Sequence, residues 1–111
     1  MSTNTPNWAE RATALKIDGR MLVDGKRVAT QTGETFAKHS PIDNRLLGPI
    51  ARGLAADVDT AVRSARAAFE DGRWAAKAPA ARKKILLKFS ELIMAAKDEL
   101  ALLETLDMGK P

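Results

Sequence analysis

The chain has no cysteine and few aromatic residues, and these absences exclude several kinds of chemistry. Its 111 residues include a single histidine, and aromatic side chains make up 5% of the sequence. Without cysteine this chain can form no disulfide, no thiolate metal site and no cysteine nucleophile. No apolar run approaches the roughly 20 residues that a membrane-spanning helix requires, and residues 1–11 lack the apolar stretch of a secretory signal. We therefore expect a cytoplasmic protein with no membrane contact.

The charge is also close to balanced, which argues against a nucleic-acid partner. The net charge is +4, from 18 basic and 14 acidic residues. One basic cluster, Arg82 to Lys84 with Lys88, lies on a predicted amphipathic helix without interleaved aromatic side chains. This pattern favours a solvated helix face over a nucleic-acid patch. A chain of this length forms one domain at most, and size scaling predicts a modest core that buries roughly two-thirds of the unfolded surface.

The first half of the chain predicts a mobile tail, a short helix and short strands. Residues 1–7 are polar and predict the tail, and residues 8–15 predict a helix that Asn7 caps. Asp24-Gly25 stands between two short apolar runs, at 21–23 and 27–29, and predicts a β-hairpin because this turn needs positive φ.

Further strands are predicted on either side of a proline-containing turn. Residues 35–39 predict an extended segment, and a turn over 41–44 leads to a strand over 46–52. Pro49 lies inside that second strand and has no N–H for a central ladder. We therefore expect an edge strand or a bulge there.

After Gly53 the pattern changes to three helices. Asp57 or Asp59 lies near the start of the first helix, and Gly72 lies just past its end. Pro79 opens the second helix. Asp98 is expected to cap the third, which ends at Gly109 in the left-handed conformation. The buried stripe predicted for the second helix consists of Ile85, Phe89, Leu92, Ile93 and Ala96.

The predicted fold class is α+β, because the strands are grouped before the helices. It divides into a tail and short helix over 1–20, a β-hairpin or meander segment over 21–53, and a three-helix segment over 54–111. A few short strands beside strongly apolar helical stripes need another element to cover them. The pattern therefore indicates an incomplete domain.

Most motifs that could carry chemistry fail on their spacing or their partners. Gly48 to Gly53 has phosphate-loop glycine spacing, but no lysine follows, and no dinucleotide fingerprint occurs anywhere. His39 has no second histidine or cysteine to complete a metal site. Ser40 and Thr105 have no visible base partner that could activate a nucleophile. We identify no catalytic and no cofactor-binding residue in this chain.

Asp107 is the one polar residue whose position asks for an explanation. It lies in the last turn of a predicted helix, where a negative charge opposes the helix dipole. Two interpretations stay open: the side chain is simply exposed to water, or a cation or a basic partner holds it in place.

The order of these segments resembles the N-terminal region of NAD(P)-dependent aldehyde dehydrogenases. Each piece is weak by itself, but all of them occur in order at family-like spacing. The residue before Pro41 is Ser40, where the family usually has asparagine or aspartate. The matching pieces are Leu22 to Lys26, Thr35-Phe36, Ser40-Pro41, Ile50 to Gly53, Asp57 to Asp59, Ala61-Val62, Ala65 to Phe69, Trp74, Arg82, Leu86 and Glu104 to Pro111.

This resemblance implies an N-terminal fragment of an enzyme whose catalytic residues come later. The complete enzyme would oxidise an aldehyde to a carboxylic acid with NAD or NADP, through a cysteine thiohemiacetal. The segment would form the outer edge of its α/β coenzyme-binding domain and pack against the remainder of the parent chain. A homo-oligomer is also implied. The first twenty residues and Glu99 to Leu103 look most like γ-glutamyl-γ-aminobutyraldehyde dehydrogenases of polyamine catabolism.

The resemblance also implies a monovalent cation site. Many family members bind such an ion through two backbone carbonyls before the proline motif and through the aspartate near the Gly-Lys-Pro motif. These positions correspond to Lys38, His39 and Asp107. The first two would act through their carbonyl oxygens only.

An alternative of a different class is a free-standing helical module that docks on a protein partner through its apolar stripes. A nucleic-acid binder is a third hypothesis. An independently folded chain without exposed apolar surface would favour the module over the fragment.

Overall fold

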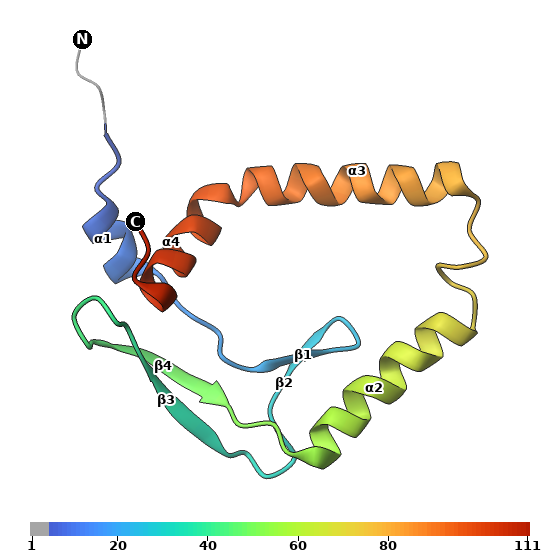
Figure 1. Cartoon of the computed structure of the whole chain (residues 1–111), viewed down its shortest axis with the longest axis horizontal. Helices are drawn as coiled ribbons and strands as arrows, with labels where there is room; N and C mark the ends of the chain where they lie inside the picture. The colour runs from blue at the N-terminus through green and yellow to red at the C-terminus, as the bar shows by residue number, and fades with distance from the viewer. Residues whose placement is uncertain (1–4) are drawn as a thin grey trace.

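A computed structural model describes residues 5–111, which trace an open frame of helices and hairpins (Figure 1). The frame measures 52 × 43 × 19 Å along its principal axes. The helices at 55–70 and 79–95 form two of its sides, the hairpin at 35–51 lies along another, and the hairpin at 21–28 projects into the frame toward the first of these helices. The elements are α1 (Trp8–Ala14), β1 (Met21–Val23), β2 (Lys26–Val28), β3 (Thr35–His39), β4 (Leu46–Ala51), α2 (Ala55–Glu70), α3 (Pro79–Ala95) and α4 (Lys97–Met108).

Helix α1 is confirmed with its predicted cap. The Asn7 side chain accepts a hydrogen bond from the Glu10 N–H at 3.1 Å, which satisfies one of the free donors at the helix start. The Arg11 guanidinium lies 4.7 Å from the centre of the Trp8 ring. The predicted mobile tail over 1–7 falls largely on residues 1–4, which lie outside the described residues.

The first hairpin, β1–β2, forms where the Asp-Gly signal predicts it. Asp24 and Gly25 adopt φ values of 52° and 71°, the left-handed pair that matches the twist of a two-residue hairpin. Val23 then pairs with Lys26 across the turn. The second strand begins at Lys26, one residue earlier than predicted.

The second hairpin, β3–β4, forms a separate two-stranded antiparallel sheet. The sequence predicts either hairpins or a single meander. The structure has two separate hairpins. Lys38 pairs with Gly48 while His39 pairs with Leu46, so Leu47 is an extra residue on β4. Pro49 pairs with Ala37 next to this bulge. In a two-stranded sheet both strands are edge strands, so the prediction of an edge strand or a bulge at Pro49 is confirmed.

Helix α2 begins at Ala55, and the buried carboxylate of Asp57, its third residue, satisfies the helix start. Its Oδ2 accepts from the Leu54 N–H and its Oδ1 from the Gln31 N–H, both at 2.9 Å. Asp57 is only 4% exposed. Of the two acidic residues predicted near the helix start, Asp57 is thus the one that caps it, and it also ties the 29–33 loop to the helix.

The predicted buried stripe of the second helix is wrong for this structure. On α3, Ile85 is 44% exposed, Phe89 59% and Leu92 56%. Ile93 is exposed as well, and Ala96, just past the helix, is half-buried. The reason is geometric: the main packing of α3 is with α4 at its C-terminal end, and the rest of the helix spans the open side of the frame (Figure 1).

Helix α4 ends as predicted but begins differently. Gly109 has φ 73° and its N–H donates to the Thr105 carbonyl at 2.8 Å, a left-handed helix end. The prediction that Asp98 caps the helix is wrong, because the helix begins at Lys97 and Asp98 lies in its first turn. The Asp98 carboxylate instead pairs with Arg11 of α1, at 3.3 Å.

The expected modest core is also wrong. Among residues 5–111, Leu106 of α4 is the single buried apolar residue, at 6% exposure. The radius of gyration is 18.2 Å, whereas a compact domain of this length has about 13 Å. No helix in the described part of the chain is both long and apolar enough to cross a bilayer. These elements are held at their junctions and not by a central core.

We predict that Asp57→Ala destabilises the natural protein by about 2–4 kcal/mol, because two backbone N–H groups lose a charged acceptor. Urea unfolding followed by circular dichroism measures the change. Asp59→Ala, in the same helix turn but exposed, is the matched control and should change stability by less than about 0.5 kcal/mol. Equal losses in the two variants would contradict the capping role of Asp57.

Candidate functional site

The end of α4 docks on the segment 38–42, and this junction contains the predicted site residues. The Ser40 hydroxyl donates to the Leu106 carbonyl at 2.7 Å, across 66 residues of sequence, and accepts from the Ile42 N–H at 3.3 Å. Ser40 is 1% exposed. A Cβ atom added to Gly109 would lie 3.2 Å from the Pro41 side chain, so the helix end packs closely against this segment. We call this junction the α4 end.

Lys38 supplies the second side chain at the α4 end. Its Nζ lies 2.9 Å from Asp107 Oδ1 and donates to the Asp107 carbonyl oxygen at 3.3 Å. An ammonium at a helix C-terminus also offsets the negative end of the helix dipole. The structure shows both features that the two interpretations of Asp107 proposed: a basic partner, Lys38, and exposure to water. The Asp107 side chain remains 60% exposed, so the pair contributes only about 0–1 kcal/mol to stability.

The carbonyls that end α4 are consequently well satisfied. The last four carbonyls of a helix have no partner within it. Here the Thr105 carbonyl accepts from the Gly109 N–H, the Leu106 carbonyl from Ser40, and the Asp107 carbonyl from Lys38. Two of these three donors are side chains from β3 and the turn that follows it.

The monovalent cation site stays a prediction. The structure brings Lys38 and Asp107 together, and His39 follows Lys38 at the irregularity in the β3–β4 pairing. The Lys38 ammonium is in contact with the Asp107 carboxylate and carbonyl. As these residues stand, a free ion would compete with that ammonium for the same two oxygens.

An apolar hollow of about 430 Å³ lies beside the α4 end. Lys38, Glu104 and Asp107 place three charged groups on its wall. The remaining lining residues come from β4, from α4 and from the linker after α1: Ile17, Leu47, Ile50, Leu100, Leu103 and Met108. The charges lie on one part of a largely apolar wall, which suits packing against an apolar segment with a polar rim.

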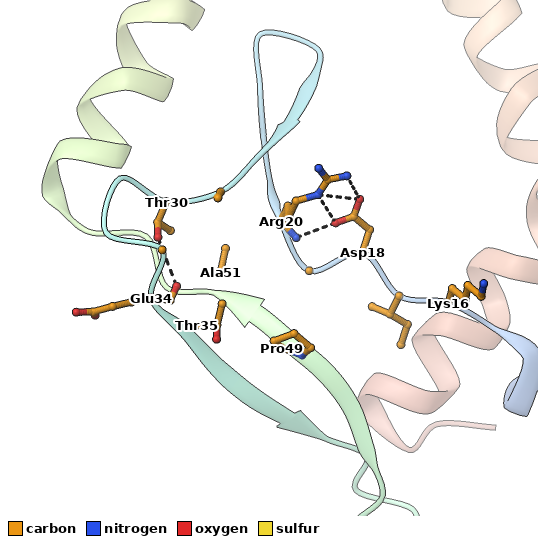
Figure 2. Close-up of a pocket in the computed structure, with 12 residues that line it drawn as sticks. Lys16, Asp18, Arg20, Thr30, Glu34, Thr35, Pro49 and Ala51 are labelled. Atoms are coloured by element: carbon orange, nitrogen blue, oxygen red, sulfur yellow. Dashed lines mark hydrogen bonds and ion pairs between the residues drawn. The ribbon is translucent and has the colours of Figure 1, made fainter.

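A second hollow, of about 370 Å³, lies between the linker 16–20, the loop 29–35 and β4 (Figure 2). Gly19 allows the linker to approach β4 closely: an added Cβ would overlap the Pro49 carbonyl oxygen. The Ala51 N–H donates to the Gly19 carbonyl at 2.8 Å. The linker thus extends the edge of the second hairpin.

An ion pair between Asp18 and Arg20 marks one wall of this second hollow (Figure 2). Arg20 Nη2 lies 2.8 Å from Asp18 Oδ2, and the Arg20 N–H donates to Oδ1 at 3.1 Å. Side-chain hydrogen bonding by Arg20 holds the pKa of Asp18 well below its ordinary value, and the same contact raises the pKa of Arg20. Both groups stay charged across the neutral range and neutralise each other.

Neither hollow assembles a catalytic set. Within residues 5–111, no three His, Asp or Glu side chains gather as metal ligands. Ser40 is buried, and its hydroxyl both donates and accepts a hydrogen bond. This agrees with the prediction that Ser40 is not a nucleophile. What the two sites can do is hold segments that are distant in sequence at fixed positions.

Three contacts that hold these sites together are not predicted by the sequence. The Lys38 side chain, the Ser40 hydroxyl and the Asp57–Gln31 bond all join elements far apart in the chain. For Ser40 a signal existed, since it stands where the resemblance expects asparagine or aspartate. Local spacing contains no signal for the other two.

Comparison with known proteins identifies the architecture. The sequence profile of the aldehyde dehydrogenase family matches residues 28–111. The chain belongs to the aldehyde dehydrogenase family. It is 43% identical over 104 residues to the NADP/NAD-dependent aldehyde dehydrogenase PuuC of Escherichia coli, covering 94% of this chain and 21% of that protein. The chain therefore spans about a fifth of the length of the curated relatives it matches.

Solved aldehyde dehydrogenases share the fold of this chain. The indole-3-acetaldehyde dehydrogenase of Pseudomonas syringae, solved as a mutant with NAD+ and IAA, matches with a TM-score of 0.92 and 50% identity, over 95% of this chain and 21% of its own. The γ-glutamyl-γ-aminobutyraldehyde dehydrogenase of Burkholderia cenocepacia matches with a TM-score of 0.92 and 47% identity over the same shares. The frame in Figure 1 is the N-terminal part of the aldehyde dehydrogenase fold.

We predict that Ser40→Ala costs this aldehyde dehydrogenase segment about 1–2 kcal/mol of stability, because the Leu106 carbonyl loses its donor. Urea unfolding of the natural protein measures this. Ser90→Ala removes an exposed hydroxyl from α3 and is the control, with an expected change within about 0.5 kcal/mol. A neutral Ser40→Ala would show that the hydroxyl does not hold the α4 end.

We predict that Gly19→Ala destabilises the protein by about 1–3 kcal/mol, since the new methyl group forces the linker away from β4. Thermal unfolding provides the measurement. Gly53→Ala is the matched control, because the nearest atom to its added Cβ is Met21 Sδ at 3.5 Å, an ordinary contact. The close approach would be disproved if both alanine variants unfolded at the same temperature as the parent.

Proposed function

We propose that the natural protein to which this chain belongs oxidises an aldehyde to a carboxylic acid with NAD+ or NADP+. The family match over residues 28–111 carries this proposal, together with a fold shared over 95% of the chain with an enzyme solved with NAD+. In the net reaction the aldehyde and water give the acid, while a hydride passes to the nicotinamide and a proton is released. A cysteine nucleophile for this reaction would have to lie outside these 111 residues.

The part of this chain in that enzyme is structural. Its helices present apolar side chains to solvent, among them Val62 at 59% exposure, Phe69 at 66% and Leu86 at 55%. Covering such side chains is worth about 1.5–3 kcal/mol each. We propose that the remainder of the parent chain covers these faces of α2 and α3.

We propose the substrate as a class, an aldehyde, because the relatives of known structure are named for different aldehydes. One relative of known structure is named for indole-3-acetaldehyde and another for γ-glutamyl-γ-aminobutyraldehyde, at 50% and 47% identity. These values are too close to separate an aryl from an amino-aldehyde substrate. The first candidate is the amino-aldehyde that the sequence predicts, because the Burkholderia enzyme, 47% identical to this chain, is named for such a substrate.

The α4 end belongs to the proposal as a cation-holding site. The Asp107 carboxylate and the carbonyls that end α4 place negative charge at one point, which favours a positive charge there. A homo-oligomeric state and a cytoplasmic location are further parts of the proposal. Size-exclusion chromatography and cell fractionation test them.

We predict that the natural protein reduces NAD+ or NADP+ when it is given an aldehyde, and that it loses this activity after treatment with a thiol-alkylating reagent. Absorbance of the reduced nicotinamide measures the rate with a γ-glutamyl amino-aldehyde, indole-3-acetaldehyde and acetaldehyde. The isolated 1–111 chain, which has no thiol, is the control and should be inactive.

The interaction-module alternative makes the opposite prediction for the isolated chain. It requires 1–111 to unfold cooperatively as a monomer with little exposed apolar surface, as measured by calorimetry and dye binding. The exposed faces of α2 and α3 support the aldehyde dehydrogenase proposal instead. A natural protein with no activity on any aldehyde, together with a cooperatively folded 1–111 chain, would overturn it.

A further inference from the structure

The α4 end gathers more negative charge than its own helix can balance. Asp107 is in the last turn of α4, where its carboxylate adds to the negative end of the helix dipole. No basic residue lies in that last turn. A positive charge that balances Asp107 therefore comes from another element or from solution.

β3 supplies that charge. The Lys38 ammonium contacts one carboxylate oxygen of Asp107 at 2.9 Å and its carbonyl oxygen at 3.3 Å. Lys38 is 69 residues away from Asp107 in the chain, so this contact is made only when β3 and α4 are docked. Its side chain is one-third exposed, at 33%, which is the most covered of the charged groups paired in the described residues.

We propose that the Lys38 ammonium is the cation of the α4 end, and that it stands where a free monovalent cation would bind. An ammonium has three N–H donors and no acceptor, so it can bind two oxygens as an ion of charge +1 would. Its place is fixed by the strand that carries it. A free ion has to displace it from both Asp107 oxygens.

The pairing geometry of β3 supports this assignment. The bulge at Leu47 lies opposite the step from Lys38 to His39. A bulge changes the direction of the side chains around it. The hydroxyl of Ser40, two residues after Lys38, donates to the carbonyl of Leu106, the residue before Asp107. Lys38 and Ser40 thus act as a pair of side-chain donors that close the same helix end.

Thermal unfolding of the natural full-length protein tests the proposal without reference to its activity. Unfolding temperatures are compared in potassium, sodium and tetramethylammonium chloride at equal ionic strength, the last cation being too large for the site. The unsubstituted protein should unfold within about 1 °C in all three salts. Relative to the unsubstituted protein, Lys38→Ala should unfold roughly 1 °C lower in tetramethylammonium chloride and regain that difference in potassium or sodium chloride.

Three further variants make the result specific. Lys38→Arg keeps a tethered cation and should stay indifferent to the salt. The double variant Lys38→Ala with Asp107→Asn should lose the recovery, because the carboxylate is gone. Lys26→Ala removes an exposed lysine from β2 and should show no salt preference.

Two outcomes would overturn the proposal. One is a preference for potassium or sodium in the unsubstituted protein as large as that of Lys38→Ala, which would show that a free ion occupies the site. The other is a Lys38→Ala variant with no difference between the salts, which would show that the site needs no cation. Where Lys38→Ala fails to fold, Lys38→Gln, which keeps a polar side chain without the charge, takes its place in the same comparison.

Discussion

The hydrogen bond from the Ser40 hydroxyl to the Leu106 carbonyl is the contact on which the rest of the frame depends. At 2.7 Å and with Ser40 buried, it fixes the end of α4 to the turn after β3. Leu106 is also the one buried apolar side chain among residues 5–111. The helix end and the second hairpin therefore meet at one point, and the contact between Lys38 and Asp107 forms at that docked end.

A second junction, at Asp57, has the same design. One buried carboxylate binds the N–H that opens α2 and an N–H of the 29–33 loop. Both junctions use a polar side chain to satisfy the end of a helix and to attach that end to a loop. Such bonds are short-ranged and directional, so they set geometry where little apolar surface is buried. The long sides of the frame, α2 and α3, have no comparable support along their lengths.

Local signals predicted the elements well and their packing poorly. Asn7, Asp24-Gly25, Pro79 and Gly109 act through bonds or φ angles within a few residues, and each begins or ends an element where expected. The apolar periodicity of α3 correctly indicates which face is apolar. It does not indicate which part of the protein covers that face. The sequence predicts a role only for the carbonyl of Lys38, because the partner of its side chain lies 69 residues away. The cation prediction itself came from family resemblance, and no local pattern carries it.

The thin, open shape of this frame has a consequence for how the proposed enzyme reaches its native state. A layer 19 Å deep with one buried apolar side chain cannot hold itself together by burial while it leaves the ribosome. Domains usually fold as units in the order of synthesis. In the proposed enzyme this segment would gain its cover only from the remainder of the chain, so Phe69, Phe89 and Leu92 would stay exposed to chaperones until that cover forms.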